Sequence, residues 1–357
     1  MLKLSVVVGA RPQFIKAAAL YHAWKKDFQS FLRWELIHTG QHYDEAMSGR
    51  FFEELALPQP NHSLQVQGLG PVETVAAMST GLSQYYSEKR PDLVLVFGDT
   101  HSTLSAALTA AGLGIPLAHV EAGLRSFRRD MPEEQARVVT DHLSTWLFAP
   151  SDLAMQQIQR EGLMEKPGSV VQNVGDIMLD AALLFSENPS HQASDGPILA
   201  TLHRNFNTDH PERLAAALQR MHESSIRLQR EVCFVAHPRT QKAMNQWNIH
   251  VGEGIFVSPP MGYLETLQAI QRAPLVLTDS GGLQKEAFFL GKRSICFRPE
   301  SEWTELVQSG WVLCPDLDKK VWEKALEDVM ASPDLPRLPW YGEGKAGWKI
   351  LSTLVGA

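Results

Sequence analysis

The sequence has no surplus of positive charge. Its 33 Lys and Arg residues stand against 40 Asp and Glu residues, which gives a net charge of −7. Nucleic-acid-binding proteins normally carry a basic excess, so we expect no nucleic-acid partner. The chain also lacks a run of about 18 uncharged apolar residues, and only a short apolar stretch precedes Arg11. We therefore expect no transmembrane helix, no signal peptide and a cytoplasmic location.

Cysteine is scarce as well. The three thiols, Cys233, Cys296 and Cys314, have no metal-ligand spacing, and each lies in or beside an apolar run. Buried free thiols in a reducing compartment are the expected state. The zinc-protease pattern H-E-x-x-H is absent too. These absences predict no metal site.

Short apolar runs alternate with amphipathic stretches along the chain. In the first half we expect strands at 4–8, 34–38, 93–97, 116–120 and 146–149, and in the second half at 197–202, 231–235, 255–257, 275–277 and 293–297. Helical stretches between them predict parallel sheets covered on both faces. At 357 residues the chain exceeds one typical core, so we predict an α/β fold of two doubly wound, Rossmann-like domains facing a central cleft. The pattern restarts after residue 168, which sets the expected domains at 1–168 and 169–344.

Charged residues follow several of these strands. Ligands of such sheets bind beyond the carboxyl ends of strands, so these positions are candidate site residues. They are Arg11, Lys16, Asp99, Glu121, Arg125 and Glu133 in the first half, and His203 in the second. Asp99 alone could simply be a helix N-cap. Carboxylates near a His nonetheless favour proton transfer on a phosphorylated or nucleotide-linked substrate.

One short stretch of the second half, from Leu277 to Ala287, reads LTDSGGLQKEA. Adjacent glycines free the backbone for close approach, and a helix N-terminus behind them attracts anions. Either Ser280 is a plain N-cap, or Ser280, Gly281 and Gly282 form a phosphate site with Glu286 one turn further in. The residues alone leave both interpretations open.

A set of motifs in fixed order covers nearly the whole chain. They read GARPQFIK, TGQHYD, FGDTHSTLSAAL, HVEAGLRS, MPEEQARVVTDHLS, NVGDIMLDA, TLHR, LTDSGGLQKEAFFLGK and YGEGKAGWKI. In this order the chain resembles the non-hydrolysing UDP-N-acetylglucosamine (UDP-GlcNAc) 2-epimerases. The resemblance implies a glycosyltransferase-B-like fold whose last helix, about 345–357, packs back on the first domain. It also implies a homodimer that makes precursors of bacterial surface polysaccharides.

The family reaction interconverts UDP-GlcNAc and UDP-N-acetylmannosamine (UDP-ManNAc) by eliminating UDP to a 2-acetamidoglucal and adding it back. The resemblance therefore implies a UDP-sugar substrate, no cofactor, and acid/base roles for Asp99, Glu121, Glu133 and His203. Lys16 and Arg125 would support these residues, and Arg11 would reach the phosphates together with His203. The SGG loop would hold the diphosphate, Glu286 the ribose, and the backbone from Tyr263 to Thr266 the uracil.

The chain departs from the family pattern at two places. Phe206 replaces the Glu of H-R-x-E-N, and of a second, activating UDP-GlcNAc site only Gln41 and His237 match. Alternatives are a 2-epimerase of UDP-2,3-diacetamido-glucuronate, or a hydrolysing epimerase that releases ManNAc and UDP. A glycosyltransferase would use the same two domains, and a non-enzymatic sugar-nucleotide sensor would not need the acid/base set.

Overall fold

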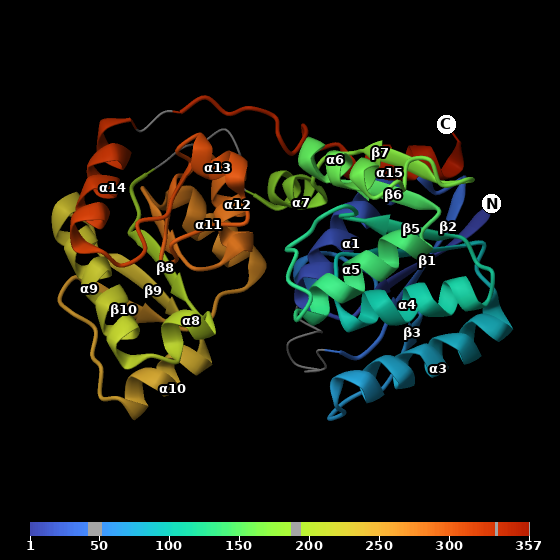
Figure 1. Cartoon of the computed structure of the whole chain (residues 1–357), viewed down its shortest axis with the longest axis horizontal. Coiled ribbons are helices and arrows are strands. Elements are labelled where there is room, and N and C mark those ends of the chain that lie inside the picture. Colours follow the sequence, from blue (N-terminus) through green and yellow to red (C-terminus); the bar gives the residue numbers. More distant parts are fainter. Residues whose placement is uncertain (42–51, 187–193, 333–334, 357) are drawn as a thin grey trace. The chain divides into compact units, whose positions relative to one another are not determined.

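The computed structural model describes residues 1–41, 52–186, 194–332 and 335–356, and the chain divides into two compact units. The first unit contains Met1–Leu184 and Pro339–Ala357, and the second contains Phe185–Leu338 (Figure 1). Residues 42–44 of the TGQHYD motif lie outside the described residues. Among the described residues, no helix combines the length and apolar character that crossing a membrane requires.

The first unit is built on a seven-stranded parallel sheet of order β3-β2-β1-β4-β5-β6-β7. Its central strand is buried from Leu4 to Val8, because helices cover both faces and every side chain of the run meets protein. The strands are β1 (Leu2–Val8), β2 (Leu32–His38), β3 (His62–Ser63), β4 (Leu93–Phe97), β5 (Leu117–Val120), β6 (Trp146–Ala149) and β7 (Val170–Asn173).

Helices follow these strands in the expected alternation. They are α1 (Arg11–Ala23), continued by a π-helical turn (Trp24–Phe28), then α3 (Pro71–Lys89), α4 (His101–Gly112), α5 (Pro132–Leu143), α6 (Asp152–Arg160) and α7 (Ile177–Phe185). The buried faces of α3 and α4, with Met78, Leu82 and Ala106, pack on Val7 and Val94 of the sheet. This packing keeps the carboxyl ends of β1 and β4 next to the start of α4.

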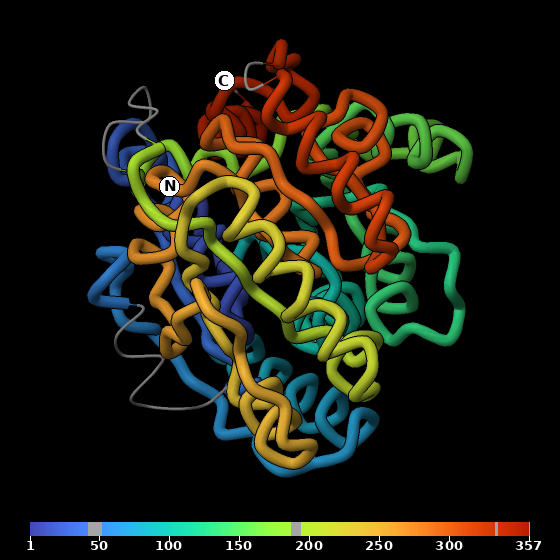
Figure 2. Tube along the Cα trace, turned by 90° about the vertical axis from the view of Figure 1, so that its left-hand side faces the viewer, coloured from blue at the N-terminus to red at the C-terminus, as the bar shows by residue number. Residues whose placement is uncertain are grey.

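The second unit repeats the plan with a six-stranded parallel sheet of order β10-β9-β8-β11-β12-β13. Its strands are β8 (Ile198–Leu202), β9 (Val232–Ala236), β10 (Ile255–Ser258), β11 (Val276–Thr278), β12 (Ser294–Cys296) and β13 (Val312–Leu313). Its helices are α8 (Asn205–Thr208), α9 (Pro211–Leu228), α10 (Pro238–Gln246), α11 (Tyr263–Arg272), α12 (Gly281–Phe289), α13 (Thr304–Gln308) and α14 (Lys319–Ala331). Figure 2 looks onto this unit, where α9 and α14 lie side by side.

The end of the chain returns to the first unit as α15 (Ala346–Val355), which packs on α1 (Figure 1). Asp180 of α7 caps it, accepting hydrogen bonds from Ala346 N at 3.0 Å and Gly347 N at 2.8 Å. The first unit does not end near residue 168, because β7 pairs with β6 and so belongs to the first sheet. The boundary lies after Leu184 instead.

Candidate functional site

Both sheets reverse their strand order at one point, between β1 and β4 in the first and between β8 and β11 in the second. Loops on either side of such a point diverge, which leaves room for a ligand at the carboxyl ends of the strands. In the first sheet, buried Gln13 joins the two loops. Its Oε1 accepts from Gly9 N at 2.8 Å and Ala10 N at 3.1 Å, and its Nε2 donates to Phe97 O at 2.9 Å and Thr100 Oγ1 at 3.0 Å.

Glu121 directly follows β5 and forms a buried ion pair with Lys16 of α1. Its backbone has φ of +72°, a left-handed conformation that a Glu adopts only when the surrounding structure imposes it. Gly98, at the end of β4, lies beside the pair: a methyl group there would come within 3.3 Å of Glu121 Oε2 and 3.6 Å of Lys16 Nζ. The fold thus holds a carboxylate and an ammonium together next to the Gly98 backbone.

Asp99, the next residue along, forms an ion pair with Arg137 of α5. It is not the N-cap of α4, because Thr100 takes that position and accepts from Thr103 N at 3.3 Å. The N-cap explanation for Asp99 therefore does not hold. Its carboxylate is half-buried beside Arg137.

The two neighbouring glutamates of α5 differ sharply. Glu133 is exposed, whereas Glu134 is buried and accepts from Ser126 N at 2.8 Å, Ser126 Oγ at 3.0 Å and Phe127 N at 2.9 Å. Burial alone would raise the pKa of Glu134, but these hydrogen bonds and nearby Arg137 hold it below its ordinary value. Glu134 was not among the predicted residues, and it fixes a loop.

Arg125 is almost completely buried and contacts two carboxylates. Nη1 lies 2.7 Å from Asp141 Oδ2, and Nε and Nη2 donate to Glu161 at 2.8 and 2.6 Å. Burial opposes the charge of Arg125, yet the two carboxylates raise its pKa above its usual value. Any support that Arg125 gives to Glu121 therefore passes through Asp141. Arg11, in contrast, is exposed at the start of α1.

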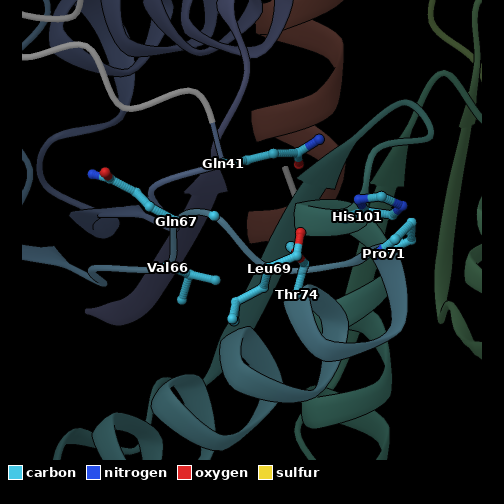
Figure 3. A pocket seen from close by; sticks show the side chains of 8 residues that line it. Gln41, Val66, Gln67, Leu69, Pro71, Thr74 and His101 are labelled. Atoms are coloured by element: carbon cyan, nitrogen blue, oxygen red, sulfur yellow. The ribbon is translucent and has the colours of Figure 1, made fainter.

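The first unit also has a cavity of about 260 Å³, lined by Gln41, Val66, Gln67, Gly68, Leu69, Pro71, Thr74 and His101. In Figure 3, Gln41 extends from the end of β2 toward His101. Its Oε1 accepts from Ser102 N at 3.1 Å and from Ser102 Oγ at 2.7 Å, so the start of α4 orients its side chain.

In the second unit, Asp279 organises the ends of β8 and β11. This fully buried carboxylate accepts from the backbone N of His203 at 3.1 Å and of Arg204 at 2.9 Å, and from Asn207 Nδ2 at 3.1 Å; His203 Nδ1 lies 3.1 Å away. Burial would raise the pKa of Asp279, but His203 and the other donors lower it. The prediction included His203 and omitted Asp279, the residue that holds it.

The SGG loop begins α12 as expected. Ser280 is the N-cap, with Oγ accepting from Leu283 N at 3.4 Å, so the capping interpretation of this residue is correct. Because Ser280 caps one backbone N–H, the other N–H groups in the first turn of α12 can bind an anion. Gly282, in this turn, is exposed. Glu286, one turn further along, is half-buried.

A carboxylate, that of Glu302, also approaches this helix start. A methyl group on Gly281 would lie 1.9 Å from Glu302 Oε1, so a side chain here would require the Glu302 carboxylate to move. Arg298 pairs with Glu302 at 2.7 Å, and Trp303 Nε1 donates to Gly281 O at 2.8 Å. Phe206 occupies the position where the family pattern has a Glu. The centroid of its ring lies 3.9 Å from Cζ of the Arg213 guanidinium, which covers it.

The predicted uracil segment begins α11. Tyr263 is buried, and Thr266 Oγ1 donates to Gly262 O at 2.7 Å. His237, which together with Gln41 matches part of the family's activating UDP-GlcNAc site, caps α10 by accepting a hydrogen bond from Arg239 N at 3.3 Å. Within the described part of the chain, no three His, Cys, Asp or Glu residues converge as a metal site would require.

Comparison with known proteins covers the full chain. The model of the family described as UDP-N-acetylglucosamine 2-epimerase matches residues 26–355. A UDP-2,3-diacetamido-2,3-dideoxy-D-glucuronate 2-epimerase of Pseudomonas aeruginosa is 43% identical over 313 residues, 87% of each chain. A UDP-N-acetylglucosamine 2-epimerase of Methanocaldococcus jannaschii is 37% identical over 365 residues, 99% of each.

The fold agrees with the sequence comparison. The crystal structure of the Methanocaldococcus jannaschii UDP-GlcNAc 2-epimerase with UDP-GlcNAc and UDP superimposes with a TM-score of 0.84 at 36% identity, covering 100% of both chains. The two parallel-sheet units are therefore Rossmann-like domains of the glycosyltransferase-B-like class. With family model, relatives and fold in agreement, the chain belongs to the UDP-N-acetylglucosamine 2-epimerase family.

Proposed function

We propose that this enzyme epimerises UDP-linked 2-acetamido sugars at C2 without hydrolysing them, and that UDP-GlcNAc and UDP-ManNAc are its substrate pair. One observation carries the proposal. Asp99 and Glu121, each paired with a cation, follow the adjacent strands β4 and β5 in a chain of this family. Inversion at one carbon needs a base on one face and an acid on the other, and two carboxylates at neighbouring strand ends would supply such a pair.

The reaction takes place in two halves. A carboxylate removes the C2 proton while the C1–O bond to UDP breaks, so the C–H electron pair forms the C1=C2 bond of a 2-acetamidoglucal and UDP leaves with the C–O pair. In the return step a UDP oxygen bonds to C1 and an acid delivers a proton to the opposite face of C2. Electrons and protons balance without a redox cofactor. Asp99, Glu121, Glu133 and His203 are the proposed acid/base set, with Lys16 beside them.

The leaving UDP needs its developing charge stabilised. We assign this role to the backbone N–H groups of Ser280, Gly281 and Gly282 at the start of α12, aided by Arg11 and His203. Glu286 would bind the ribose hydroxyls, and the backbone from Tyr263 to Thr266 the uracil. We also propose a homodimer that supplies precursors of surface polysaccharides.

A second substrate has support of its own. The relative from Pseudomonas aeruginosa, 43% identical, is a UDP-2,3-diacetamido-glucuronate 2-epimerase. Its named sugar differs from GlcNAc at C3 and C6, away from the reacting C2, so the same acid/base set would serve both. Comparing kcat/KM for the two UDP-sugars decides between them.

The test is turnover of UDP-GlcNAc alone in heavy water, followed by NMR. We expect both epimers to acquire deuterium at C2, with traces of free UDP and the glucal. The variants Asp99→Asn, Glu121→Gln and Glu133→Gln should slow exchange by about 10²–10⁴-fold each. Full retention of the C2 hydrogen, or a requirement for NAD, would reject elimination. Release of ManNAc and UDP in equal amounts would identify a hydrolysing enzyme.

A further inference from the structure

The loops that carry Asp99 and Glu121 are joined by a buried His–Asp pair that the proposed chemistry does not use. His119 of β5 and Asp141 of α5 are fully buried, and His119 Nδ1 lies 2.7 Å from Asp141 Oδ1. The other ring nitrogen, Nε2, lies 2.7 Å from the carbonyl oxygen of Gly98. Both partners are oxygen atoms, so the ring bridges the Asp141 carboxylate and the Gly98 carbonyl.

Asp141 reaches the other loop. Its Oδ2 accepts from Gly123 N at 3.0 Å and lies 2.7 Å from Arg125 Nη1. Burial opposes the charge of Asp141, yet its pKa is lowered by His119 and Arg125. Gly123 has φ of +82°, and a methyl group on it would lie 2.4 Å from Ala154 O, so this turn packs closely against the backbone of α6 and has no room for a side chain.

The pair therefore connects two backbone points next to the candidate carboxylates. One is the carbonyl of Gly98, immediately before Asp99, and the other is the N–H of Gly123, two residues after Glu121. Glu121 has a positive φ of +72°, so its loop depends on its surroundings for its shape. Holding these two backbone points in place therefore sets the distance between the backbone positions from which the Asp99 and Glu121 side chains extend.

We propose that His119 and Asp141 are positioning residues for C2 proton transfer, holding the Asp99 and Glu121 loops in register. Neither touches the substrate; they act through the backbone of Gly98 and Gly123. This proposal rests on the proposed function of Asp99 and Glu121. Misplacing a reacting group by about 1 Å can cost about 10²-fold in rate, so loss of the pair should lower kcat.

The same network offers a matched control. Glu161 binds Arg125 from the other side, with contacts of 2.8 and 2.6 Å, and none of its described contacts is with Gly98 or Gly123. Glu161→Gln weakens a buried charge pair of the same cluster while leaving the bonds to Gly98 and Gly123 in place. It reports what destabilising the network does by itself.

The experiment compares full-length Asp141→Asn, His119→Asn, His119→Gln and Glu161→Gln with the wild type. His119→Asn keeps a donor toward Asp141, and His119→Gln keeps one toward Gly98, so each tests one end of the pair. We measure kcat, KM and C2 deuterium exchange for UDP-GlcNAc and its 2,3-diacetamido-glucuronate analogue, the UDP Kd by calorimetry, and the unfolding temperature.

We expect Asp141→Asn and His119→Asn to lower kcat about 10²-fold with UDP Kd changed less than twofold, because the proposed UDP contacts in the second unit are untouched. His119→Gln should recover part of kcat. Glu161→Gln should lower the unfolding temperature with kcat within threefold of wild type. If Asp141→Asn does not fold, the two His119 variants carry the comparison.

Equal losses of kcat in Glu161→Gln and in the His119 or Asp141 variants at the same loss of unfolding temperature would overturn the proposal, since the network would then only stabilise. A parallel loss of UDP affinity would overturn it as well. Failure of the proposed function looks different: the wild type itself would exchange no C2 hydrogen with either UDP-sugar, and the positioning role would fall with it.

Discussion

The adjacent residues Glu133 and Glu134 should respond in opposite ways to the same substitution. Glu134→Gln leaves one side-chain oxygen where a carboxylate accepted four hydrogen bonds, including one from Arg137, and turns an amide group toward a donor. Phe127, whose N–H donates to Glu134, has a strained φ of +58°, and this hydrogen bond helps to hold it there. Losing one hydrogen bond to a charged group costs about 1.5–3 kcal/mol.

We therefore expect the local stability of the loop to fall by about 2–3 kcal/mol, which corresponds to about 30–160-fold less protection against hydrogen exchange. Hydrogen exchange with mass spectrometry on peptides containing Ser126 and Phe127 measures this directly. Glu133 is exposed, so Glu133→Gln should leave protection unchanged while slowing C2 deuterium exchange by about 10²–10⁴-fold.

The pH dependence adds an independent check. The folded pKa of Glu134 lies below its ordinary value of 4.5, so its contribution to stability is complete above pH 4.5 and is lost as the pH falls through the folded pKa. The difference in protection between wild type and Glu134→Gln should therefore shrink on acidification below pH 4.5. Unchanged protection in Glu134→Gln at pH 7, or a loosened loop in Glu133→Gln, would refute the assignment of the two residues.

Three further predictions concern other parts of the molecule. Ser280→Ala and Glu286→Ala should each weaken UDP binding by about 1.5–3 kcal/mol in calorimetry, and unchanged affinity in both would remove the SGG loop from the site. Burial raises the pKa of Asp180 from 3.8 to about 6, so the folded protein favours the protonated carboxyl. The contribution of this group to stability is therefore present below pH 3.8 and is lost as the pH rises through 6, a loss of about 3 kcal/mol. Urea unfolding should show this loss in the pH–stability curve of the wild type and not in that of Asp180→Asn. Gly9→Ala would place a methyl group 2.0 Å from Ser102 Oγ and 2.2 Å from Thr39 Oγ1, so its unfolding free energy should drop by about 1–3 kcal/mol, and an unchanged value would show that these hydroxyls move freely.

The sequence could predict the strands and the residues that follow them because both depend on local patterns. The run at 93–97 is β4 and the run at 146–149 is β6, each with the bounds expected from continuous apolar residues. Short or weakly apolar elements escaped prediction. β7 ends in Gln172 and Asn173, and its membership of the first sheet depends on pairing with β6, which no local pattern contains.

The residues that position the site were missed for a related reason: their partners are distant in the chain. Asp141 lies on a helix twenty-two residues beyond His119, and Asp279 lies seventy-six beyond His203, yet each carboxylate holds the loop that carries a candidate catalytic group. In the sequence, Asp279 has a usable signal, since it directly follows an apolar strand as Asp99 nearly does. Asp141 has none, because a carboxylate on a helix normally faces solvent. Only folding shows that it is fully buried between His119, Arg125 and the backbone of Gly123, a placement that a buried charge tolerates when each oxygen is paired. Candidate proton-transfer groups can thus be predicted from their position at strand ends, whereas the groups that fix their geometry have to be sought among buried charges one contact behind them.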